Sequence, residues 1–457
     1  MSVTSDLQGL CVSLTDGALL TSPESTERYR RDRADILSAG VPLTVVRAGN
    51  LDDVTATLRW AHAHRVPVVP RGAGSGLSGG ANAIDGCIVL SLERMTRIRE
   101  VNAEQQYLVA EAGTITADVG RAAAQSGLFY PPDPGSFEIC TIGGNLATNA
   151  GGMRCVKYGV TRDSTLELEV VLADGTLLNT GSRTRKNVAG YDLTSLFVGS
   201  EGTLGVITAA TLRLRPLPRT PPATFAAVFD SLGAVGDAVA AIQASGVMPS
   251  LLEFIDNRTI NAIEDFRRLD LDRSAAGLLI GQADTAGATD DVRLMVAACE
   301  AANATFVIDT ADRTEADLLL EARRLAGTAV MAKGPTVIED VGVPPGQLRS
   351  MLEAVEELSG RWGIPIATTA HAGDGNLHPV FLLPDLEQGT IDQALAAGQE
   401  LCDRALALNG TVTGEHGIGV LKREWLHGQV TAAAIAVHQA VKAALDPEGL
   451  LNPGRAF

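Results

Sequence analysis

The alternation of apolar and polar residues predicts a mixed protein in which strands and helices follow one another along the chain. Short runs rich in Val, Ile and Leu, bounded by Gly, Pro or Asp, are typical of strands. Such runs lie at residues 41–46, 65–70, 87–92, 107–111, 166–173, 205–214, 224–229, 250–255, 277–282 and 305–309. Apolar residues at helical spacing predict helices at 117–126, 315–325, 347–362 and 391–408. They also predict one helix that begins after an N-cap at Asn50 and another near the C-terminus.

Four prolines (Pro216, Pro218, Pro221 and Pro222) interrupt this pattern near the middle of the chain. Proline has no N–H to give to the ladder of a central strand, so these residues mark a domain boundary. We expect a helical N-terminal preface at residues 1–35, one domain at 36–218 and a second at 219–457. The strands and amphipathic helices after the boundary predict an α+β sheet layered with helices.

Glycine is concentrated between Pro132 and Val206. Five glycines fall between Gly143 and Gly159, interleaved with Asn and Thr rather than with large apolar residues. Glycine lets backbone N–H groups approach a ligand closely, and it carries an entropic cost in an ordinary core. The stretch therefore predicts a bed for a large flat cofactor, with a set of tight turns as the alternative.

A second glycine-rich segment, residues 71–80, contains the spacing G-x-G-x-x-G at Gly74, Gly76 and Gly79. A dinucleotide fingerprint would need a helix to begin at the third glycine. Here the loop leads to Asp85-Gly86 and a strand, so we reject a Rossmann fold. The N–H groups of such a loop still form an anion nest suited to a pyrophosphate. Arg71 is either a source of positive charge for that anion or an ordinary surface arginine.

Two histidines flank a predicted hairpin. Asp374-Gly375 between apolar runs is a two-residue turn signal. A turn at these residues would place His371 opposite His378, with Cβ atoms about 4.5–5.5 Å apart, close enough to share one metal ion. Glu415 would complete a His₂Glu ligand set, and His416 would be a proton acceptor. The alternative is that these are ordinary hydrogen-bonded histidines.

Composition narrows the function classes. The chain has 457 residues and a net charge of −17, from 37 Lys+Arg against 54 Asp+Glu. A negative field of this size argues against nucleic acid and anionic lipid as partners. No apolar run is long enough to span a bilayer, and no secretory signal opens the sequence. Six cysteines without a CxxC pair are typical of free thiols in a reducing compartment, so we expect a cytoplasmic protein without a transmembrane segment.

These motifs together resemble a known family. They read PRGAGSGLSGG at 70–80, IGGNLATNAGGMRCVKYG at 142–159, GSEGTLGVIT at 199–208, HAGDGNLHP at 371–379, GEHGIG at 414–419 and LDPEGLLNPGR at 445–455. From about residue 36 to the C-terminus the chain is similar to the FAD-linked D-2-hydroxyacid dehydrogenases. This family includes the flavin-binding component of glycolate oxidase, D-lactate dehydrogenase and D-2-hydroxyglutarate dehydrogenase. The resemblance implies a fold of the vanillyl-alcohol-oxidase/PCMH type: two α/β subdomains that bind FAD, and a C-terminal α+β cap domain whose last segment returns to the FAD domain.

The resemblance also assigns residues to roles. Those expected to bind FAD are Pro70, Arg71, Gly72, Ala73, Gly74, Ser75, Gly76, Leu77, Ser78, Gly80, Pro132, Asp133, Thr141, Gly143, Gly144, Asn145, Thr148, Asn149, Gly151, Gly152, Tyr158, Glu201, Gly205, Val206, Ile207 and Asn452. His371, His378 and Glu415 match metal ligands, with Zn²⁺ the expected ion. His416 matches the catalytic base, and Arg323 matches an arginine that binds the substrate carboxylate.

The expected reaction is FAD-dependent, metal-assisted oxidation of a D-2-hydroxy acid of the D-lactate or glycolate class to the 2-oxo acid. Hydride would pass to flavin N5, and the electrons would go on to an acceptor other than NAD. The hydroxyglutarate members carry a lysine shortly before an Asp-x-x-x-Pro motif, which corresponds to residues 340–344 here. This chain has Val337, Ile338 and Glu339 at that place, and its lysine, Lys333, lies earlier in the sequence. Glu339 would repel a second carboxylate, so a monocarboxylate is favoured. Some flavoproteins of this fold attach FAD covalently through a histidine in the first glycine-rich loop. No histidine lies in the loop 71–80, so we expect dissociable FAD, with Cys140 as the nearby alternative anchor.

Several alternatives stay open at this level. Three other roles fit the same residues: a D-2-hydroxyglutarate dehydrogenase, the FAD subunit of a multi-subunit glycolate oxidase, and an electron-relay subunit that needs partners to turn over. An alditol or lactone oxidase of the same fold would lack the paired metal ligands. The electron acceptor, whether a quinone, a cytochrome or another flavoprotein, is not determined by the residues, and a homodimer is compatible with them.

Overall fold

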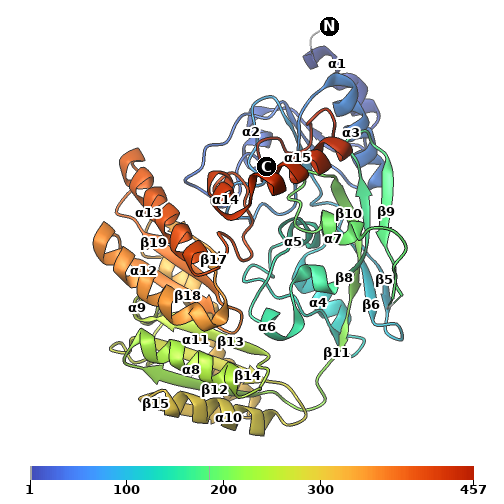
Figure 1. The fold of residues 1–457 in the computed structure, drawn as a ribbon. Helices are drawn as coiled ribbons and strands as arrows, with labels where there is room; N and C mark the ends of the chain where they lie inside the picture. The colour runs from blue at the N-terminus through green and yellow to red at the C-terminus, as the bar shows by residue number, and fades with distance from the viewer. Residues whose placement is uncertain (1–2, 185, 457) are drawn as a thin grey trace. The chain divides into compact units, whose positions relative to one another are not determined.

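The computed structural model describes residues 3–184 and 186–456, and these divide into two compact units. The first unit consists of Met1–Gly151, Gly159–Leu217 and Glu415–Phe457, and the second of Gly152–Tyr158 and Pro218–Gly414. Residues 1 and 2 of the expected N-terminal preface, and residue 457 at the end of the expected C-terminal domain, lie outside the described residues. Figure 1 shows the elements of each unit along the chain.

The first unit contains a four-stranded sheet in the order β1-β2-β4-β3. Its strands are β1 (Leu19–Leu20), β2 (Thr44–Arg47), β3 (Val68–Arg71) and β4 (Ile88–Ser91). Strands β2 and β3 both pair with β4 in parallel, and β1 pairs with β2 antiparallel. The expected preface thus supplies a strand to this sheet, besides helices α1 (Val3–Val12) and α2 (Pro23–Glu27).

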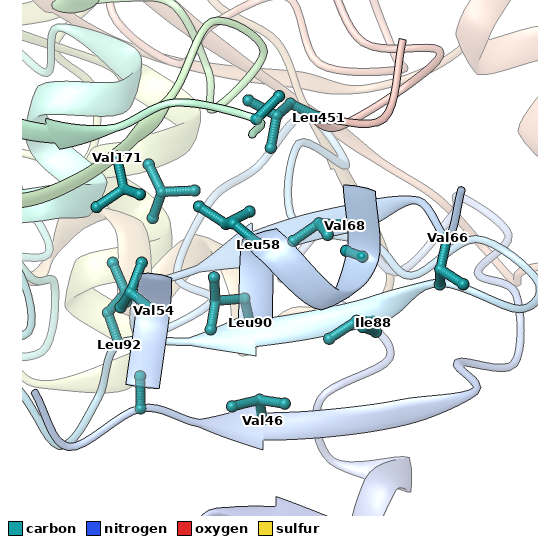
Figure 2. Packing of buried hydrophobic residues seen from close by; sticks show 14 of the residues in the cluster. Val46, Val54, Leu58, Val66, Val68, Ile88, Leu90, Leu92, Val171 and Leu451 are labelled. Atoms are coloured by element: carbon teal, nitrogen blue, oxygen red, sulfur yellow. The ribbon is translucent and has the colours of Figure 1, made fainter. Parts of the chain in front are cut away.

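Helix α3 (Leu51–His64) covers this sheet, and local signals define both of its ends. The Asn50 side chain accepts the Asp53 N–H at 2.9 Å, as the N-cap prediction required. Arg65 ends the helix in the left-handed region at φ 53°. Val54 and Leu58 pack into a core with Leu90 and with Leu451 from the far end of the sequence, as Figure 2 shows.

The second sheet of this unit is antiparallel, in the order β5-β6-β10-β8-β9. Its strands are β5 (Ile98–Asn102), β6 (Tyr107–Glu111), β8 (Thr165–Val171), β9 (Leu177–Gly181) and β10 (Val206–Arg213), and a small separate pair joins β7 (Leu128–Phe129) to β11 (Arg215–Pro216). The remaining helices are α4 (Thr116–Ala124), α5 (Ile142–Thr148), η1 (Thr161–Ser164), α7 (Leu193–Phe197), α14 (Arg423–Gln429) and α15 (Ala432–Leu445). A core that includes Ile142, Leu146, Phe197 and Leu212 lies between the helices and the sheet.

The second unit is built on an eight-stranded antiparallel sheet in the order β15-β12-β14-β13-β18-β19-β16, with β17 also paired to β19. The strands are β12 (Ala223–Phe229), β13 (Leu251–Asp256), β14 (Gly277–Ala283), β15 (Phe306–Thr310), β16 (Thr336–Ile338), β17 (Val341–Gly342), β18 (Ile366–His371) and β19 (Asn376–Leu382). The helices are α6 (Cys155–Tyr158), α8 (Leu232–Ala244), α9 (Asn257–Phe266), α10 (Ala288–Ala301), α11 (Arg313–Met331), η2 (Pro345–Gln347), α12 (Leu348–Trp362) and α13 (Gln388–Ala407).

Side-chain alternation along β13 assigns the two helical layers to the two faces of this sheet. Leu251 and Ile255 share a buried cluster with Ala326 of α11 and Ile260 of α9. Phe254 points the other way, toward α8, because a Cβ added at Gly277 would lie 2.6 Å from its ring and 3.2 Å from Val235. Helices α9 and α11 therefore cover one face, and α8, α10 and α12 cover the other (Figure 1).

The expected strands and helices are found in place, most within three residues of their predicted ends. Helix α11 is longer than expected, at Arg313–Met331, and α5 is a helix where only a glycine-rich bed was expected. No helix follows the loop after β3, in agreement with the rejected Rossmann fold. Within the described part of the chain, no helix is both long and apolar enough to cross a membrane.

Candidate active site

The loop that follows β3 offers a row of backbone donors. Among the described residues, no hydrogen bond uses a backbone N–H of residues 72–78 as its donor. Gly74 adopts φ +69°, and a Cβ there would lie 2.0 Å from the Arg71 guanidinium. Consecutive N–H groups without protein acceptors are the donor set of an anion nest, so this loop suits a diphosphate. We call residues 72–78 the nest loop.

Arg71, at the start of this loop, is not a surface arginine. Its residue is only 7% exposed, and its Nη2 donates to the Arg31 carbonyl at 2.8 Å. Burial lowers the pKa of this guanidinium, with Asp32 acting in the opposite direction. The guanidinium lies against Gly74 and so supports the loop from within, and its burial excludes the surface-arginine interpretation. Its role as a source of positive charge for a bound anion stays a prediction.

The glycine-rich stretch begins as helix α5, whose N-cap Thr141 accepts the Gly144 N–H at 3.2 Å. Two glycines, one in this stretch and one in the loop after β3, lie directly against other segments. A Cβ at Gly143 would lie 2.7 Å from the Ala112 Cβ, and one at Gly72 would lie 2.3 Å from Thr141 Oγ1. These glycines allow α5 to approach the sheet and the nest loop. Asn145 is buried, and its Nδ2 donates to Thr116 Oγ1 at 2.7 Å.

Glu201 joins three distant segments of the first unit. Its carboxylate is buried and accepts the N–H groups of Ile418 and Gly419, each at 2.7 Å. Burial raises the pKa of Glu201, and these two hydrogen bonds oppose that shift. Asn452 Nδ2 donates to the carbonyls of Glu201 (2.7 Å) and Gly80 (3.0 Å). The Asn452 Oδ1 is buried without a hydrogen-bond partner among the described residues, so this acceptor awaits a donor from a ligand.

The other predicted cofactor residues divide into three groups. Val206 and Ile207 lie in the two hydrophobic cores, and Gly205 packs 2.5 Å from Val170, measured from its added Cβ. Gly152 and Tyr158 belong to the second unit, where the Tyr158 hydroxyl donates to Asp284 at 2.5 Å. In the first unit, outside the nest loop, lie Pro132, Asp133, Gly144, Thr148, Asn149 and Gly151. The cofactor role of all three groups stays a prediction.

The donors and acceptors of the first unit fit FAD. A loop with unpaired amides can hold the pyrophosphate, and the unsatisfied Asn452 oxygen can accept an N–H of the ring system or a hydroxyl. His416 is anchored to the same loop, since Ser78 Oγ donates to its carbonyl at 3.1 Å. The backbone of Val420 also donates to the Ser78 carbonyl, at 2.8 Å.

In the second unit, the strand pairing corrects the predicted hairpin. The turn has four residues, 372–375, and His371 pairs with Asn376 while Thr369 pairs with His378. The two histidines are therefore diagonal neighbours rather than direct partners. They still share one face of the sheet, because residues two apart on a strand point the same way. Their ring centroids are 5.0 Å apart, at an interplanar angle of 83°.

Glu253, which sequence reasoning missed, connects two of the predicted site residues. It lies directly opposite His371 in the β13–β18 pairing and is fully buried. Its carboxylate accepts from His371 Nδ1 (2.8 and 2.9 Å) and from Arg323 Nε (2.6 Å). Among the described residues, the two terminal nitrogens of Arg323 donate to no acceptor. A carboxylic acid within an otherwise apolar strand was the available signal in the sequence.

Asp340 organises the neighbourhood of the second histidine. It is fully buried, and its carboxylate accepts from Asn376 Nδ2 and Thr413 Oγ1, both at 2.6 Å. It also accepts the Gly414 N–H at 2.8 Å and lies 3.6 Å from His378 Nδ1. The carboxylate thus fixes both the strand that carries His378 and the last residue of the second unit.

Glu415 and His416 begin the final segment of the first unit. The His416 Nε2 lies 4.0 Å from the Glu415 carboxylate, and both side chains are largely buried, at 17% and 12% exposure. Glu415 directly follows Gly414, the residue whose N–H is bound to Asp340. The covalent chain therefore keeps Glu415 one residue away from that contact.

Comparisons with known proteins support the fold first. The substrate-bound crystal structure of p-cresol methylhydroxylase superposes with a TM-score of 0.83 at 15% identity, covering 99% of this chain and 96% of that one. A 4-ethylphenol oxidase from Gulosibacter chungangensis gives 0.79 at 17% identity, covering 99% and 96%. The chain thus has the PCMH/vanillyl-alcohol-oxidase type of fold, with an FAD-binding domain and a C-terminal domain, and the predicted fold class is confirmed.

Sequence comparisons then give the family. The FAD binding domain profile matches residues 42–181, and the profile for the C-terminal domain of FAD linked oxidases matches 221–456. The glycolate oxidase subunit GlcD of Bacillus subtilis is 39% identical over 96% of this chain and 92% of its own length. A probable mitochondrial D-lactate dehydrogenase of Danio rerio is 35% identical over 94% and 87%. The chain belongs to the FAD-linked oxidases, and it is a flavin-dependent oxidoreductase.

Proposed function

We propose that this protein oxidises a small D-2-hydroxy monocarboxylate, glycolate or D-lactate, to the 2-oxo acid with FAD and a divalent metal. The relatives named above support the substrate class, since their names specify glycolate and D-lactate. The observation that carries the proposal is the cluster on one sheet face in the second unit. There a buried glutamate orients a histidine and an arginine whose terminal nitrogens are unused.

Arg323 is the residue that would bind the substrate carboxylate. Its Nε is held by Glu253, which leaves the outer edge of the guanidinium for a bidentate pair with a carboxylate. Its side chain is 14% exposed, so such a pair would be largely shielded from water. Arg323 would bind one carboxylate. Just before residue 340, where the hydroxyglutarate members have a lysine, this chain has the fully buried Glu339. That position therefore supplies no cation for a second carboxylate.

His371, His378 and Glu415 would hold the metal, for which we propose Zn²⁺. Nitrogen and carboxylate ligands with an open position are typical of catalytic zinc. Glu253 occupies His371 Nδ1, so that ring can offer Nε2 to an ion. Glu415 is tethered one residue beyond Gly414, whose N–H is bound to Asp340 beside His378. A bound divalent ion supplies a Lewis acid that lowers the pKa of the substrate hydroxyl.

His416 would accept the hydroxyl proton. Its backbone is fixed to Ser78 in the loop that suits the FAD pyrophosphate, which ties the base to the cofactor-binding unit. Bound FAD supplies the acceptor for the two electrons and the C2 hydrogen. We propose that FAD is held without a covalent bond, since the alternative anchor Cys140 is 3% exposed with its sulfur 3.3 Å from Thr116 Oγ1.

A second candidate function differs in assembly rather than in chemistry. The chain would act as the FAD subunit of a multi-subunit glycolate oxidase, because relatives of 39% and 38% identity are named as subunits. The reduced flavin would then pass electrons to a partner rather than to a free acceptor. A quinone, a cytochrome or another flavoprotein each remains compatible with this role.

Anaerobic mixing of the FAD-loaded protein with four acids tests the proposal. Flavin bleaching is expected to be fast with D-lactate or glycolate, slower with D-2-hydroxyglutarate, and slowest with L-lactate, whose C2 hydrogen points the wrong way. Removal of the metal with a chelator should abolish the fast phase, and added Zn²⁺ should restore it. Unchanged bleaching after chelation would rule out metal assistance, and no bleaching with any acid would rule out the substrate class. Turnover with an artificial dye by the isolated chain separates a complete dehydrogenase from an obligate subunit.

A further inference from the structure

Glu253 is placed by the sheet, not by a flexible loop. Strand β13 lies between β14 and β18, and Glu253 faces Ile280 on one side and His371 on the other. Its neighbours along the strand on the same face, Leu251 and Ile255, belong to the core beneath α11. A fully buried carboxylate in such a core is costly unless it is paired and hydrogen-bonded. Both of its partners here, His371 and Arg323, are residues of the candidate site.

We propose that Glu253 is a positioning residue that couples the metal ligand His371 to the carboxylate-binding Arg323. The inference rests on the proposed function and extends it. By accepting the proton of Nδ1, the carboxylate fixes the His371 tautomer whose Nε2 carries the lone pair. By accepting Nε–H of Arg323, it aims the two terminal nitrogens away from itself. Its negative charge also offsets the charge of the Arg323 guanidinium.

Replacement by glutamine distinguishes this role from simple space filling. Glutamine has the same size, but it has one acceptor oxygen and one NH₂ donor group. If its oxygen faces His371, its NH₂ meets the Arg323 Nε–H, donor against donor. If its oxygen faces Arg323, its NH₂ drives His371 to accept at Nδ1, and the proton moves to Nε2, where a metal would bind. Arg323 cannot give up its Nε–H, whereas His371 can change tautomer, so we expect the second orientation, and the metal ligand is then the partner that is damaged.

Cobalt(II) provides a readout that needs no turnover. We expect E253Q to bind Co²⁺ about 10–100-fold more weakly than wild type in chelator competition, the usual range for loss of a carboxylate behind a metal-bound histidine. The visible Co²⁺ absorption bands, which report ligand geometry, should change in shape. E253D keeps the charge but is one methylene shorter, so its hydrogen bond with His371 Nδ1 should weaken, and we expect a loss of about 10-fold. Should E253Q fail to fold, E253D decides the question by the same two measurements.

Glu264 supplies the matched control. It is a buried glutamate of the same unit whose Oε1 accepts the N–H groups of Leu269 and Leu271, both at 2.9 Å. A glutamine there can keep that single acceptor, so E264Q should leave Co²⁺ affinity and spectrum unchanged. If E253Q and E253D bind Co²⁺ as wild type does, with the same spectrum, the positioning role is overturned while the proposed function stands. If the wild-type protein binds no Co²⁺, both the metal in the proposed function and this inference are overturned.

Discussion

The two units prepare their ligand sites by opposite means. In the first unit the backbone supplies the donors: the amides of residues 72–78 donate to no acceptor in the described part of the chain, and the buried carboxylate of Glu201 binds backbone N–H groups. In the second unit side chains supply them, since the buried Glu253 binds an imidazole and a guanidinium. A backbone site is specified by glycines and by packing around them. A side-chain site depends on single functional groups, so the loss of one such group should have a large effect in either unit.

The largest effect is expected from the proton acceptor. Replacing His416 with alanine should slow flavin reduction by about 10²–10⁴-fold, the usual contribution of a general base. FAD content should stay unchanged, because Ser78 holds the backbone carbonyl of His416 and not its ring. His438, exposed on α15 of the same unit, gives the control H438A, which should reduce flavin at the wild-type rate. Wild-type reduction rates in H416A would show that the side chain is not the base.

The buried carboxylate of Asp256 should make the free energy of unfolding of the second unit depend on pH. Burial raises the pKa of Asp256 from 3.8 to about 6, against hydrogen bonds from Thr259. The folded state therefore holds this proton more tightly than the unfolded state, so stability falls as pH rises through that interval. The difference in unfolding free energy between wild type and D256N should decline by on the order of 3 kcal/mol from pH 4 to pH 7. Chemical denaturation at several pH values measures it, and a flat difference contradicts the expectation; D270N, at an exposed position, serves as the control.

Neighbouring arginines on α11 test the carboxylate contact. Loss of a charge-assisted pair costs about 1.5–3 kcal/mol, so R323A should raise the KM for D-lactate or glycolate by about 10–100-fold. Arg324 is half exposed and pairs with Asp317 at 3.1 Å on the surface, so R324A should change KM little. Equal effects of the two substitutions would remove Arg323 from the substrate site.

Two glycines test the backbone-built unit. Gly74 and Gly86 both have positive φ, at +69° and +75°, but only at Gly74 would a Cβ collide, 2.0 Å from Arg71. Both alanine variants carry the strain of a left-handed residue, about 1–2 kcal/mol. G74A should lose a further ~1–3 kcal/mol from overpacking and should also lose FAD. Flavin content and thermal unfolding compare the pair, and full FAD retention in G74A would argue against the nest.

The sequence predicted the regular elements well, because local patterns specify them. Strand β6 was expected at its observed ends, Tyr107–Glu111, and the N-cap at Asn50 was expected from its spacing to Asp53. The hairpin at Asp374-Gly375 shows where local signals fail. Gly375 is required because a Cβ there would lie 2.0 Å from the Val343 carbonyl, a contact made by another segment. The turn therefore has four residues, and the histidines are diagonal rather than opposite.

The candidate site was predictable in its histidines but not in their support. His371 and His378 stand out by type and by glycine neighbours, and the resemblance added Arg323. Glu253 was missed because its partners come from a strand more than a hundred residues later and from a helix in between. The burial of Arg71 was not predicted for a similar reason, since its acceptor is a carbonyl at residue 31. Such pairings follow from sheet order and loop packing, which a single sequence does not display.

The discontinuity of the first unit has a consequence for biosynthesis. Val68 of strand β3 exchanges backbone hydrogen bonds with Leu450 and Asn452, so the nest loop borders on residues that are synthesised after the second unit. On the ribosome, the second unit is almost entirely synthesised before this edge strand can gain its partner. We expect nascent chains arrested before residue 415 to bind no flavin, and cofactor capture to follow the synthesis of residues 415–452.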